Sequence, residues 1–564
     1  MKQVVQNYKT GKLTVDDVPA PELKAKCILV ENRCSLISAG TEKSTIDMSR
    51  KNLLAKAQAR PDLVKKVINQ VKKDGVIDTA KMVRGRLDTR AALGYSCAGV
   101  IASVADGVEG FTAGDRVACA GQNYASHAEV VNIPKNLCIR IPEAVSFEEA
   151  SYVAVGSIAL QGVRQSEPKL GEVVAVIGLG LLGQLAVQLL KANGCTVIAS
   201  DLDAAKLELA EKLGADRAVA GNELPGAVSG ATAGHGADAV LITASTKSSG
   251  PVELAGEICR SKGRVVVVGA VGMDLPREPY YIKELDLRLS CSYGPGRYDT
   301  SYEENGNDYP YGYVRWTEQR NMVAFLELVA QGKIDLKSLT THSFDIEDAK
   351  TAYDMIADQS EPYLGIVLQY KSGSSNRFSR RVALGAPRVS NAGIKLGLIG
   401  VGNHVKDMLL PAVRKNSAVD IKAVCTSTGL NARFVAEKEE ADYCVTNYQE
   451  IIDDPDINAV IVGTRHDTHA EIVLAALRHN KHIFVEKPLC LNIDQLNEID
   501  AAYAEVAEQG VVLQVGFNRR YSKHAETMKS FFGLRNNPLT MIYRVNAGVI
   551  PAEHWVQDVA VGGG

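Results

Sequence analysis

Two glycine-rich sequences, far apart in the chain, have the residue spacing of a turn that binds a dinucleotide. Their residues are Gly178, Gly180 and Gly183 in the first, and Gly400, Gly402 and Asn403 in the second. In such a turn the first glycine makes a tight bend, and the second lets a pyrophosphate approach free N–H groups at the start of a helix. The spacing therefore predicts two nucleotide sites, with the chemistry of two dehydrogenases in tandem.

The first turn lies in a complete strand, turn, helix and strand pattern. Residues 171–177 read as an apolar strand, an apolar helix runs to Asn193, and residues 196–200 read as a second strand ending at Asp201. A carboxylate about 20 residues past the glycines can accept hydrogen bonds from a ribose and repel a 2′-phosphate. We predict NAD at this site. The alternative is that Asp201 only caps a helix.

The second turn follows an apolar strand at 394–399. Val405 replaces the third glycine, which loosens the expected helix-to-strand contact but keeps the phosphate-binding turn. The next strand ends in hydroxyls, Thr426 and Ser427, instead of a carboxylate, and Arg433 follows. The sequence predicts NAD or NADP here and leaves the choice open.

The composition favours a small-molecule partner. The 564 residues carry 63 Lys or Arg against 66 Asp or Glu, a net charge of −3, so charge gives no argument for nucleic acid or an anionic membrane. No apolar run is long enough to insert in a membrane, and the first residues do not read as a signal peptide. We expect a cytoplasmic protein. The 11 cysteines are scattered singly, which is typical of buried thiols.

Residues 1–370 resemble the medium-chain alcohol dehydrogenase family, with the sequence 114–117 (Gly-Asp-Arg-Val) and the first glycine turn as the best matches. The resemblance implies a β-rich GroES-like substrate domain at 1–150, with short strands that include 124–129. It implies a Rossmann NAD-binding domain at 151–290 and a return to the substrate domain at 291–370.

Two departures from that family concern its catalytic zinc. Ser38 stands where zinc members carry a cysteine before Gly-Thr-Asp, and Tyr95 stands where they carry the histidine of Gly-His-Glu. Catalytic zinc needs about three thiolate, imidazole or carboxylate ligands, so we predict no metal, with His127 in a structural role. Tyr95 and Ser38 are then the candidates to polarise a carbonyl by hydrogen bonds. An alternative is that this half binds a nucleotide and has lost its chemistry.

Two segments exceed the family outline. Residues 42–90 are predicted as a helical insertion with 13 Lys or Arg against 6 Asp or Glu. The basic side chains could form either a solvated helical face or a cationic lid over an anionic substrate, and the sequence does not decide between these two roles. Residues 292–316 concentrate tyrosines, arginines and carboxylates, which suit the apolar face and hydroxyls of a sugar ring. Packing or a subunit interface is the alternative, and a homo-oligomer is left open.

After a Gly/Ser-rich stretch at 371–393, predicted to be a linker, the chain resembles the glucose-fructose oxidoreductase, inositol dehydrogenase and MocA family. The motifs are Thr464 after one strand, Glu486-Lys487-Pro488 after the next, and the run from Gly516. The resemblance implies that Thr464, Glu486 and Lys487 contact the cofactor, and that Lys487 hydrogen-bonds the reacting sugar hydroxyl. Arg465 departs from the proline common there.

The predicted fold class is α/β, with two Rossmann-type doubly wound domains. The second spans 394–515, and 516–564 is read as the start of an α+β substrate domain. That family's acid–base histidine follows this point, so we expect a longer chain, with a second site that turns over poorly as given.

The function implied is a nicotinamide-dependent oxidoreductase of a sugar, cyclitol or nucleotide sugar in bacterial surface-polysaccharide assembly. The alternative is a redox-neutral epimerase that uses both sites.

Overall fold

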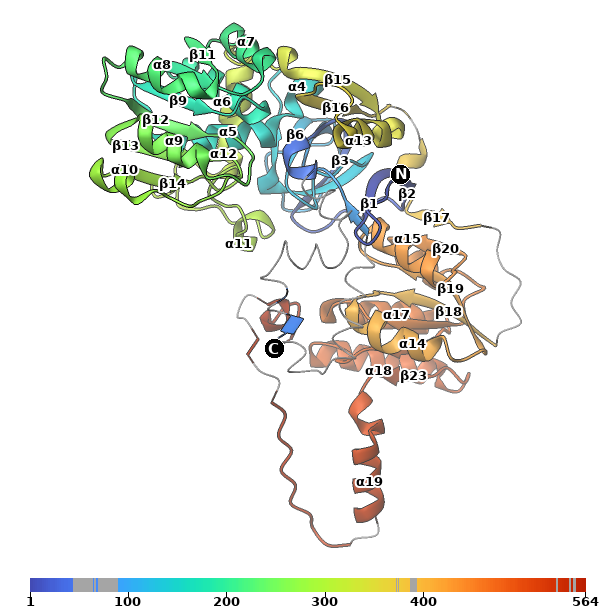
Figure 1. The fold of residues 1–564 in the computed structure, drawn as a ribbon. Coiled ribbons are helices and arrows are strands. Elements are labelled where there is room, and N and C mark those ends of the chain that lie inside the picture. Colours follow the sequence, from blue (N-terminus) through green and yellow to red (C-terminus); the bar gives the residue numbers. More distant parts are fainter. Residues whose placement is uncertain are drawn as a thin grey trace. The chain divides into compact units, whose positions relative to one another are not determined.

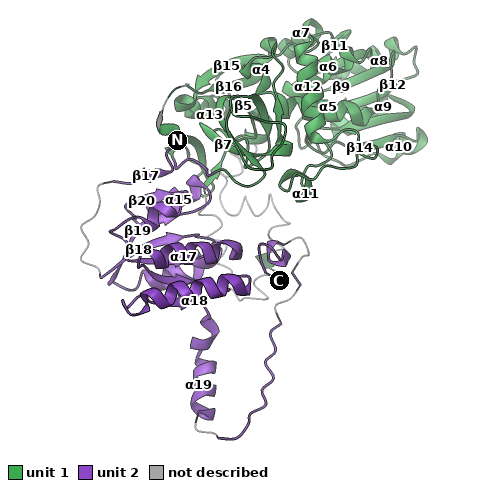
Figure 2. Cartoon of the chain, turned by 180° about the vertical axis from the view of Figure 1, so that it is seen from behind, with its two compact units in different colours: residues 1–17, 23–73, 87–377 green, residues 18–22, 74–86, 378–564 purple. Residues whose placement is uncertain are grey.

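The computed structural model describes residues 1–43, 64, 67–68, 90–371, 373, 375–385, 393–533, 536–546, 549–550 and 554–563. By their contacts these residues form two compact units (Figure 2). Unit 1 comprises the described residues of 1–17, 23–73 and 87–377, and unit 2 comprises those of 18–22 and 378–564. The basic insertion predicted at 42–90 lies almost wholly outside the described residues.

A six-stranded parallel sheet forms one part of unit 1, in the order β11-β10-β9-β12-β13-β14. Its strands are β9 (Val173–Ile177), β10 (Thr196–Ser200), β11 (Arg217–Val219), β12 (Ala237–Ile242), β13 (Cys259–Val267) and β14 (Asp286–Leu289). Their Val- and Ile-rich sequences suit a sheet that is buried on both faces.

Helices cover both faces of this sheet, because successive residues of each strand point to opposite sides. On β9, Val174 and Val176 belong to one apolar core with α5 and α6, whereas Ala175 and Ile177 belong to another with α8 and α9. The surrounding helices are α5 (Val153–Ser166), α6 (Leu181–Ala192), α7 (Ala204–Lys212), η2 (Gly221–Glu223), α8 (Leu224–Ala231), α9 (Gly250–Ile258), α10 (Arg277–Ile282) and α12 (Glu318–Ala330). The doubly wound arrangement predicted from the sequence is confirmed.

A second, mainly antiparallel sheet of unit 1 follows the order β15-β16-β3-β5-β6-β8, with β7 also paired to β3. Its strands are β3 (Cys27–Ile37), β5 (Ser96–Val104), β6 (Arg116–Ala120), β7 (Val130–Pro134), β8 (Cys138–Arg140), β15 (Thr340–Asp345) and β16 (Gly365–Gln369), beside a small sheet of β1 (Lys2–Asn7), β2 (Leu13–Asp17) and β4 (Arg90–Ala92). Residues 124–129, predicted as a strand, instead form turns and bends, with one isolated bridge from Ala128 to Gln3.

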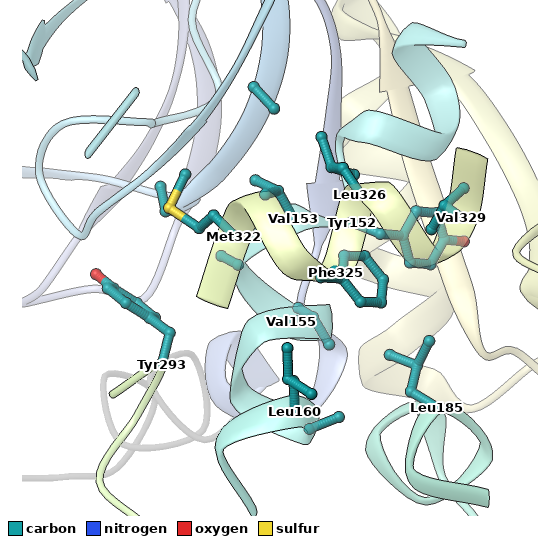
Figure 3. Close-up of a cluster of buried hydrophobic side chains, with 14 of the residues drawn as sticks. Tyr152, Val153, Val155, Leu160, Leu185, Tyr293, Met322, Phe325, Leu326 and Val329 are labelled. Atoms are coloured by element: carbon teal, nitrogen blue, oxygen red, sulfur yellow. The ribbon is translucent and has the colours of Figure 1, made fainter. Parts of the chain in front are cut away.

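After α12 the chain adds β15 and β16 to this sheet. The buried side chains of α12, including Met322, Phe325 and Leu326, pack with α5 (Figure 3). A Cβ on Gly156 would come 2.2 Å from the Phe325 ring, so this glycine lets the two helices approach. The remaining elements are η1 (Lys135–Leu137), α4 (Phe147–Ala150), α11 (Thr300–Glu303), η3 (Lys337–Leu339), η4 (Ile346–Asp348) and α13 (Ala349–Asp358).

Unit 2 contains a seven-stranded sheet in the order β17-β20-β19-β18-β21-β22-β23, with only the edge strand β17 antiparallel (Figure 1). Its strands are β17 (Arg381–Ala383), β18 (Ile394–Ile399), β19 (Val419–Cys425), β20 (Tyr443–Val445), β21 (Ala459–Val462), β22 (His482–Val485) and β23 (Leu513–Val515). Part of the segment predicted as a linker therefore adds a strand to this sheet.

The helices of unit 2 lie on both faces of its sheet, since alternate residues of β19 and β21 belong to two separate apolar cores. They are the π-helix η6 (Val405–Leu409), α14 (Leu410–Val413), α15 (Gly429–Lys438), α16 (Gln449–Ile452), η7 (His466–Thr468), α17 (His469–Arg478), α18 (Ile493–Ala507), η8 (Asn518–Tyr521), α19 (Lys523–Phe532) and η9 (Trp555–Gln557). The short η5 (Ser375–Phe378) belongs to unit 1 except for its last residue. In the described part of the whole chain, no helix has the length and apolarity needed to cross a membrane.

Candidate active sites

The first glycine turn joins β9 to α6 in unit 1. Gly178 has φ of 97°, and a Cβ there would lie 2.7 Å from the Ala244 backbone. A Cβ on Gly183 would come 1.9 Å from the Gly178 carbonyl oxygen, so a side chain would force the helix away from the strand. Gly180 caps α6, and no heavy atom of the described residues lies within 4 Å of its Cβ position. This open space borders the free N–H groups that bind a pyrophosphate.

Asp201 follows β10, and its carboxylate reaches the glycine turn. Oδ2 accepts the Leu179 N–H at 2.6 Å, and Oδ1 accepts the N–H groups of Leu202 and Asp203 at 2.8 and 3.0 Å. A carboxylate has about four acceptor positions, so Asp201 retains capacity for a ribose hydroxyl. The same side chain also holds the glycine turn in place.

Ser38 and Tyr95 lie together beside the antiparallel sheet, at the end of β3 and the start of β5. The Tyr95 hydroxyl donates to Ser38 Oγ at 2.6 Å, which leaves the Ser38 proton free to be donated onward. The Ser38 N–H donates to Glu42 Oε1 at 2.9 Å, and the Tyr353 hydroxyl donates to Glu42 Oε2. The buried Glu42 carboxylate therefore anchors the backbone of Ser38.

Burial raises the pKa of Tyr95; hydrogen bonds with Ser38 and Thr41 partly oppose this shift, and the charge of Glu42 adds to it. The phenol thus stays protonated at neutral pH and acts as a donor. A chain of donors from Tyr95 through Ser38 suits a carbonyl or alkoxide oxygen, because both accept hydrogen bonds. It does not suit a general base.

The second glycine turn joins β18 to η6 in unit 2. Gly400 has φ of 80°, and a Cβ there would lie 2.5 Å from the Thr464 nitrogen. No described heavy atom lies within 4 Å of the Cβ position of Gly402, which precedes Asn403. A Cβ on Gly463 would lie 2.3 Å from Val405 Cγ2. The absence of a side chain at Gly463 therefore accommodates Val405, the residue that replaces the third glycine.

The strand end that would contact the ribose of this second site is neutral. Thr426 is buried and donates its hydroxyl proton to the Thr428 carbonyl at 2.8 Å, whereas Ser427 is exposed. The Arg433 Nε donates to Glu437 Oε1 at 2.7 Å, one turn along α15. This arginine is therefore already engaged by a carboxylate.

Lys487 follows β22, on a segment whose backbone is fixed on both sides. The Glu486 N–H donates to the Val462 carbonyl at 2.9 Å, and Glu486 Oε1 lies 3.0 Å from Nε2 of His404, at the second glycine turn. His469 Nδ1 lies 2.6 Å from the Pro488 carbonyl oxygen. The Lys487 side chain is exposed and has no hydrogen-bond or ion-pair partner among the described residues. Its ammonium is therefore available to a ligand.

Thr464 lies two residues after the end of β21, the strand that pairs with β22. Its hydroxyl oxygen accepts from Thr468 at 2.7 Å, and its carbonyl oxygen lies 3.3 Å from His469 Nε2. Burial lowers the pKa of His469, and the two carbonyl contacts partly oppose that shift. We assign the proton of the neutral ring to Nδ1, which makes the shorter contact. The structure thus brings Gly400, Thr464, Glu486 and Lys487 to one edge of the sheet.

Two family models match the chain. Residues 182–304 match the zinc-binding dehydrogenases, and residues 394–517 match the Gfo/Idh/MocA model, described as an oxidoreductase family with an NAD-binding Rossmann fold. The chain is a tandem of an alcohol dehydrogenase-like half and a Gfo/Idh/MocA-like half. The resemblance stated from the sequence is thereby confirmed for both halves.

Similar proteins carry sugar and polyol dehydrogenase names. Inositol 2-dehydrogenase of Salmonella paratyphi B is 30% identical over 164 residues, 28% of this chain and 48% of that protein. Sorbitol dehydrogenase of Bacillus subtilis is 26% identical over 293 residues, 46% of this chain and 76% of that protein. The chain thus spans about half the length of the inositol relative.

A solved Escherichia coli oxidoreductase/dehydrogenase has a similar fold, with a TM-score of 0.51 and 18% identity. The match covers 66% of this chain and 100% of that one.

The donor set of the alcohol dehydrogenase-like half does not fit a catalytic zinc. Ser38 and Tyr95 are hydrogen-bonded to each other, and His127 Nδ1 lies 2.7 Å from Ser35 Oγ. His127 Nε2 lies 3.4 Å from Glu42 Oε2. In the described ranges, no group of three His, Cys, Asp or Glu side chains could hold a metal ion. The prediction of a zinc-free site therefore rests on hydroxyls at two ligand positions.

The purified protein is expected to carry no stoichiometric zinc and to keep its activity in EDTA, because hydroxyls of Ser38 and Tyr95 replace stronger zinc ligands. Elemental analysis and activity before and after chelation measure this. As a control, a known zinc-dependent dehydrogenase is assayed in parallel. It must lose its activity in EDTA, which shows that the chelator removes catalytic zinc under these conditions. One zinc per chain, with activity that the chelator removes, would contradict the prediction.

Sequence reasoning did not identify three side chains that organise these sites. Glu42 anchors Ser38, His404 bonds Glu486, and His469 holds the carbonyl after Lys487. His404 had a signal, since it is the second residue after Gly402 in the glycine turn. The partners of Glu42 and His469 depend on long-range contacts that no local spacing reveals.

Proposed function

We propose that this chain is a nicotinamide-dependent oxidoreductase of a neutral polyol, cyclitol or sugar. The observation that carries the proposal is the pair of glycine turns, each with open space over its second glycine. A bound nicotinamide would exchange hydride with the substrate carbon. The proposed substrate class has support from relatives named for inositol and sorbitol. In its narrower form, the proposal is that the substrate is a nucleotide sugar used in surface-polysaccharide assembly.

In the first unit, we propose that Ser38 donates its proton to the substrate oxygen and that Tyr95 supports it as a second donor. The raised pKa of Tyr95, caused first by burial, favours carbonyl reduction at neutral pH over proton removal from an alcohol. In the second unit, Lys487 is proposed to hydrogen-bond the reacting hydroxyl, while Glu486 and Thr464 border the cofactor.

The direct test is a substrate panel that includes sorbitol, myo-inositol, their ketones and nucleotide sugars. Each compound is mixed with the purified chain and NAD or NADP, or with the reduced cofactor, and absorbance at the reduced-nicotinamide band is followed. Cofactor-dependent turnover of a polyol or sugar supports the proposal. Cofactor binding without turnover of any compound would instead favour a nucleotide-binding scaffold.

Replacing Asp201 by asparagine is expected to weaken NAD binding at the first site about tenfold and to reduce its preference over NADP. The charged acceptor for the ribose hydroxyls is lost, and so is its repulsion of a 2′-phosphate. Titration of NADH fluorescence measures both affinities. Asp203→Asn is the matched control, because the Asp203 side chain caps α7 instead. Equal NAD affinity in the Asp201 variant would contradict the ribose role.

Two nucleotide turns in one chain also support a second candidate, a redox-neutral epimerase in which one site oxidises a carbon and the other reduces it. The distinguishing result is conversion of one sugar into its epimer without net NADH accumulation. Chromatography of the sugar products, together with cofactor absorbance, separates this reaction from simple oxidation. Stoichiometric NADH production would exclude the epimerase.

A further inference from the structure

His127 of unit 1 lies in the segment that forms turns where the sequence predicted a strand. Its N–H donates to the Leu93 carbonyl at 2.8 Å, and its carbonyl accepts the Val4 N–H at 2.8 Å. Both backbone groups are therefore satisfied, and the residue is 0% exposed. A polar ring buried in this way needs partners for its nitrogens.

The face of the ring packs against the residue before Tyr95. Gly94 has φ of 90°, and a Cβ there would lie 2.8 Å from three ring carbons of His127. A side chain at this position would therefore displace the ring or the backbone. The carbonyl of Tyr95 is also held, since it accepts the Gly121 N–H at 3.0 Å. The imidazole thus touches the backbone that carries the Tyr95 phenol.

One edge of the ring faces the carboxylate that holds Ser38. Nε2 of His127 lies 3.4 Å from Glu42 Oε2, while Glu42 Oε1 accepts the Ser38 N–H at 2.9 Å. The separation of 3.4 Å is too long for a strong hydrogen bond. Glu42 is only 4% exposed, so water screens the attraction between the ring and the carboxylate weakly. His127 therefore borders the supports of both Ser38 and Tyr95.

The other ring nitrogen determines the tautomer. Nδ1 of His127 lies 2.7 Å from Ser35 Oγ, which in turn lies 2.7 Å from the Tyr370 hydroxyl. Burial raises the pKa of Tyr370, and the hydrogen bond with Ser35 only partly opposes this shift, so the phenol is a donor at neutral pH. Ser35 then accepts from Tyr370 and donates to Nδ1. We assign the ring proton to Nε2, toward Glu42.

We propose that His127 is a positioning residue for the donor pair of unit 1, Ser38 and Tyr95. Its Nε2–H holds the Glu42 carboxylate beneath the Ser38 backbone. Its ring face fixes Gly94, and hence the start of the Tyr95 side chain. Together these contacts maintain the 2.6 Å hydrogen bond from Tyr95 to Ser38. This inference rests on the proposed function, because these two hydroxyls are the proposed donors to the substrate oxygen.

The test compares His127→Gln with His127→Asn in the intact chain, in a Lys487→Ala background that suppresses turnover at the second site. The amide nitrogen of glutamine reaches the place of Nε2 and keeps a donor toward Glu42, whereas asparagine reaches only the place of Nδ1. The probe is D-fructose, the ketone of sorbitol, with NADH.

The asparagine variant should lose at least about tenfold in kcat, because a donor misplaced by about 1 Å can cost on the order of a hundredfold. Its KM for D-fructose should stay within about twofold, since the donors act mainly on the developing alkoxide. The glutamine variant should recover most of the kcat. Its recovery distinguishes the contact with Glu42 from the mere filling of space.

His342→Asn is the matched control. This histidine also lies beside a glutamate, with Nε2 3.1 Å from Glu361 Oε2, but at the surface of the same unit. An asparagine variant of His127 with the kcat of the Lys487→Ala background would overturn the inference. Equal losses in the glutamine and asparagine variants would overturn it too, because packing of the ring alone would then explain the effect.

Two further measurements cover the remaining outcomes. If His127→Asn does not fold, Ser35→Ala takes its place: it removes the hydroxyl that fixes the tautomer, so kcat should fall, and an unchanged kcat would refute the positioning role. If the chain reduces no D-fructose, the proposed function fails for this probe, and crystal structures test the positioning role separately. The bond from Tyr95 to Ser38 should then persist with glutamine and break with asparagine; a bond kept in both variants would refute the inference.

Discussion

Replacing Lys487 by alanine is expected to reduce turnover at the second site by at least about a hundredfold, the scale of acid–base and electrostatic assistance. The ammonium is exposed and has no partner among the described residues, so its loss removes a group available to the substrate. The segment that carries it is held by Glu486 and Pro488 contacts that do not involve its side chain. Cofactor affinity should therefore change little.

The measurement uses the intact chain with Ser38→Ala and Tyr95→Phe, so that turnover at the first site does not hide the effect. Lys487→Arg tests the chemistry, because arginine keeps the charge but does not release its proton. Recovery with arginine indicates electrostatic support alone, and no recovery indicates proton transfer. Lys529→Ala, on α19, is the control. Unchanged turnover in the alanine variant would locate the sugar chemistry away from Lys487.

Local sequence patterns predicted the nucleotide folds because the physics of these turns is local. Gly178 and Gly400 have positive φ, and Gly180 and Gly402 have open space beside them, as their spacing predicted. The strands before each turn were equally clear, since they are short apolar runs that end at glycine. Local patterns could not predict how the second turn tolerates Val405 at the position of its third glycine. That tolerance depends on Gly463, which lies far away in the sequence and contacts Val405 only in the folded chain.

The sequence was less informative where burial decides the outcome. Residues 124–129 contain strand-forming residues but form turns, and β17 forms in a segment with the composition of a linker because it pairs with β20. Ser38 and Tyr95 were predicted as donors by alignment position alone. Their bond to each other, and the buried carboxylate of Glu42 beneath Ser38, come from the tertiary fold.

Glu318 is the strongest case of this kind. In the sequence it is one glutamate at the start of a helix, a common position for an acidic residue. Only the folded chain makes it a fully buried acid close to Glu303 and Asp299, with Arg297 as the nearby cation. Burying such a group lowers the stability of the folded chain, and the size of this effect can be measured.

Glu318→Gln is expected to stabilise unit 1 by on the order of 3 kcal/mol at pH 7. The carboxyl has a pKa of about 9 in the folded chain and the ordinary value of 4.5 when unfolded. Below pH 4 it is protonated in both states and carries no penalty. As the pH rises from 5 to 9, the unfolded chain releases the proton while the folded chain keeps it. Unfolding is thereby favoured by about 1.4 kcal/mol per pH unit.

The free energy of unfolding is measured by denaturant titration between pH 5 and 9 in a Trp555→Phe background. The remaining tryptophan, Trp316, then reports on unit 1 from a position two residues before Glu318. All other groups titrate equally in the wild type and in the Glu318→Gln variant, so the difference between their free energies of unfolding reports on Glu318 alone. Glu327 is an exposed glutamate on the same helix. The free energy of unfolding of Glu327→Gln should show the same pH dependence as that of the wild type. The two curves should diverge steadily with pH, because only the wild type holds a proton that its unfolded chain releases. Parallel curves would mean that Glu318 is ionised in the folded chain, against the direction of the shift that burial gives its pKa.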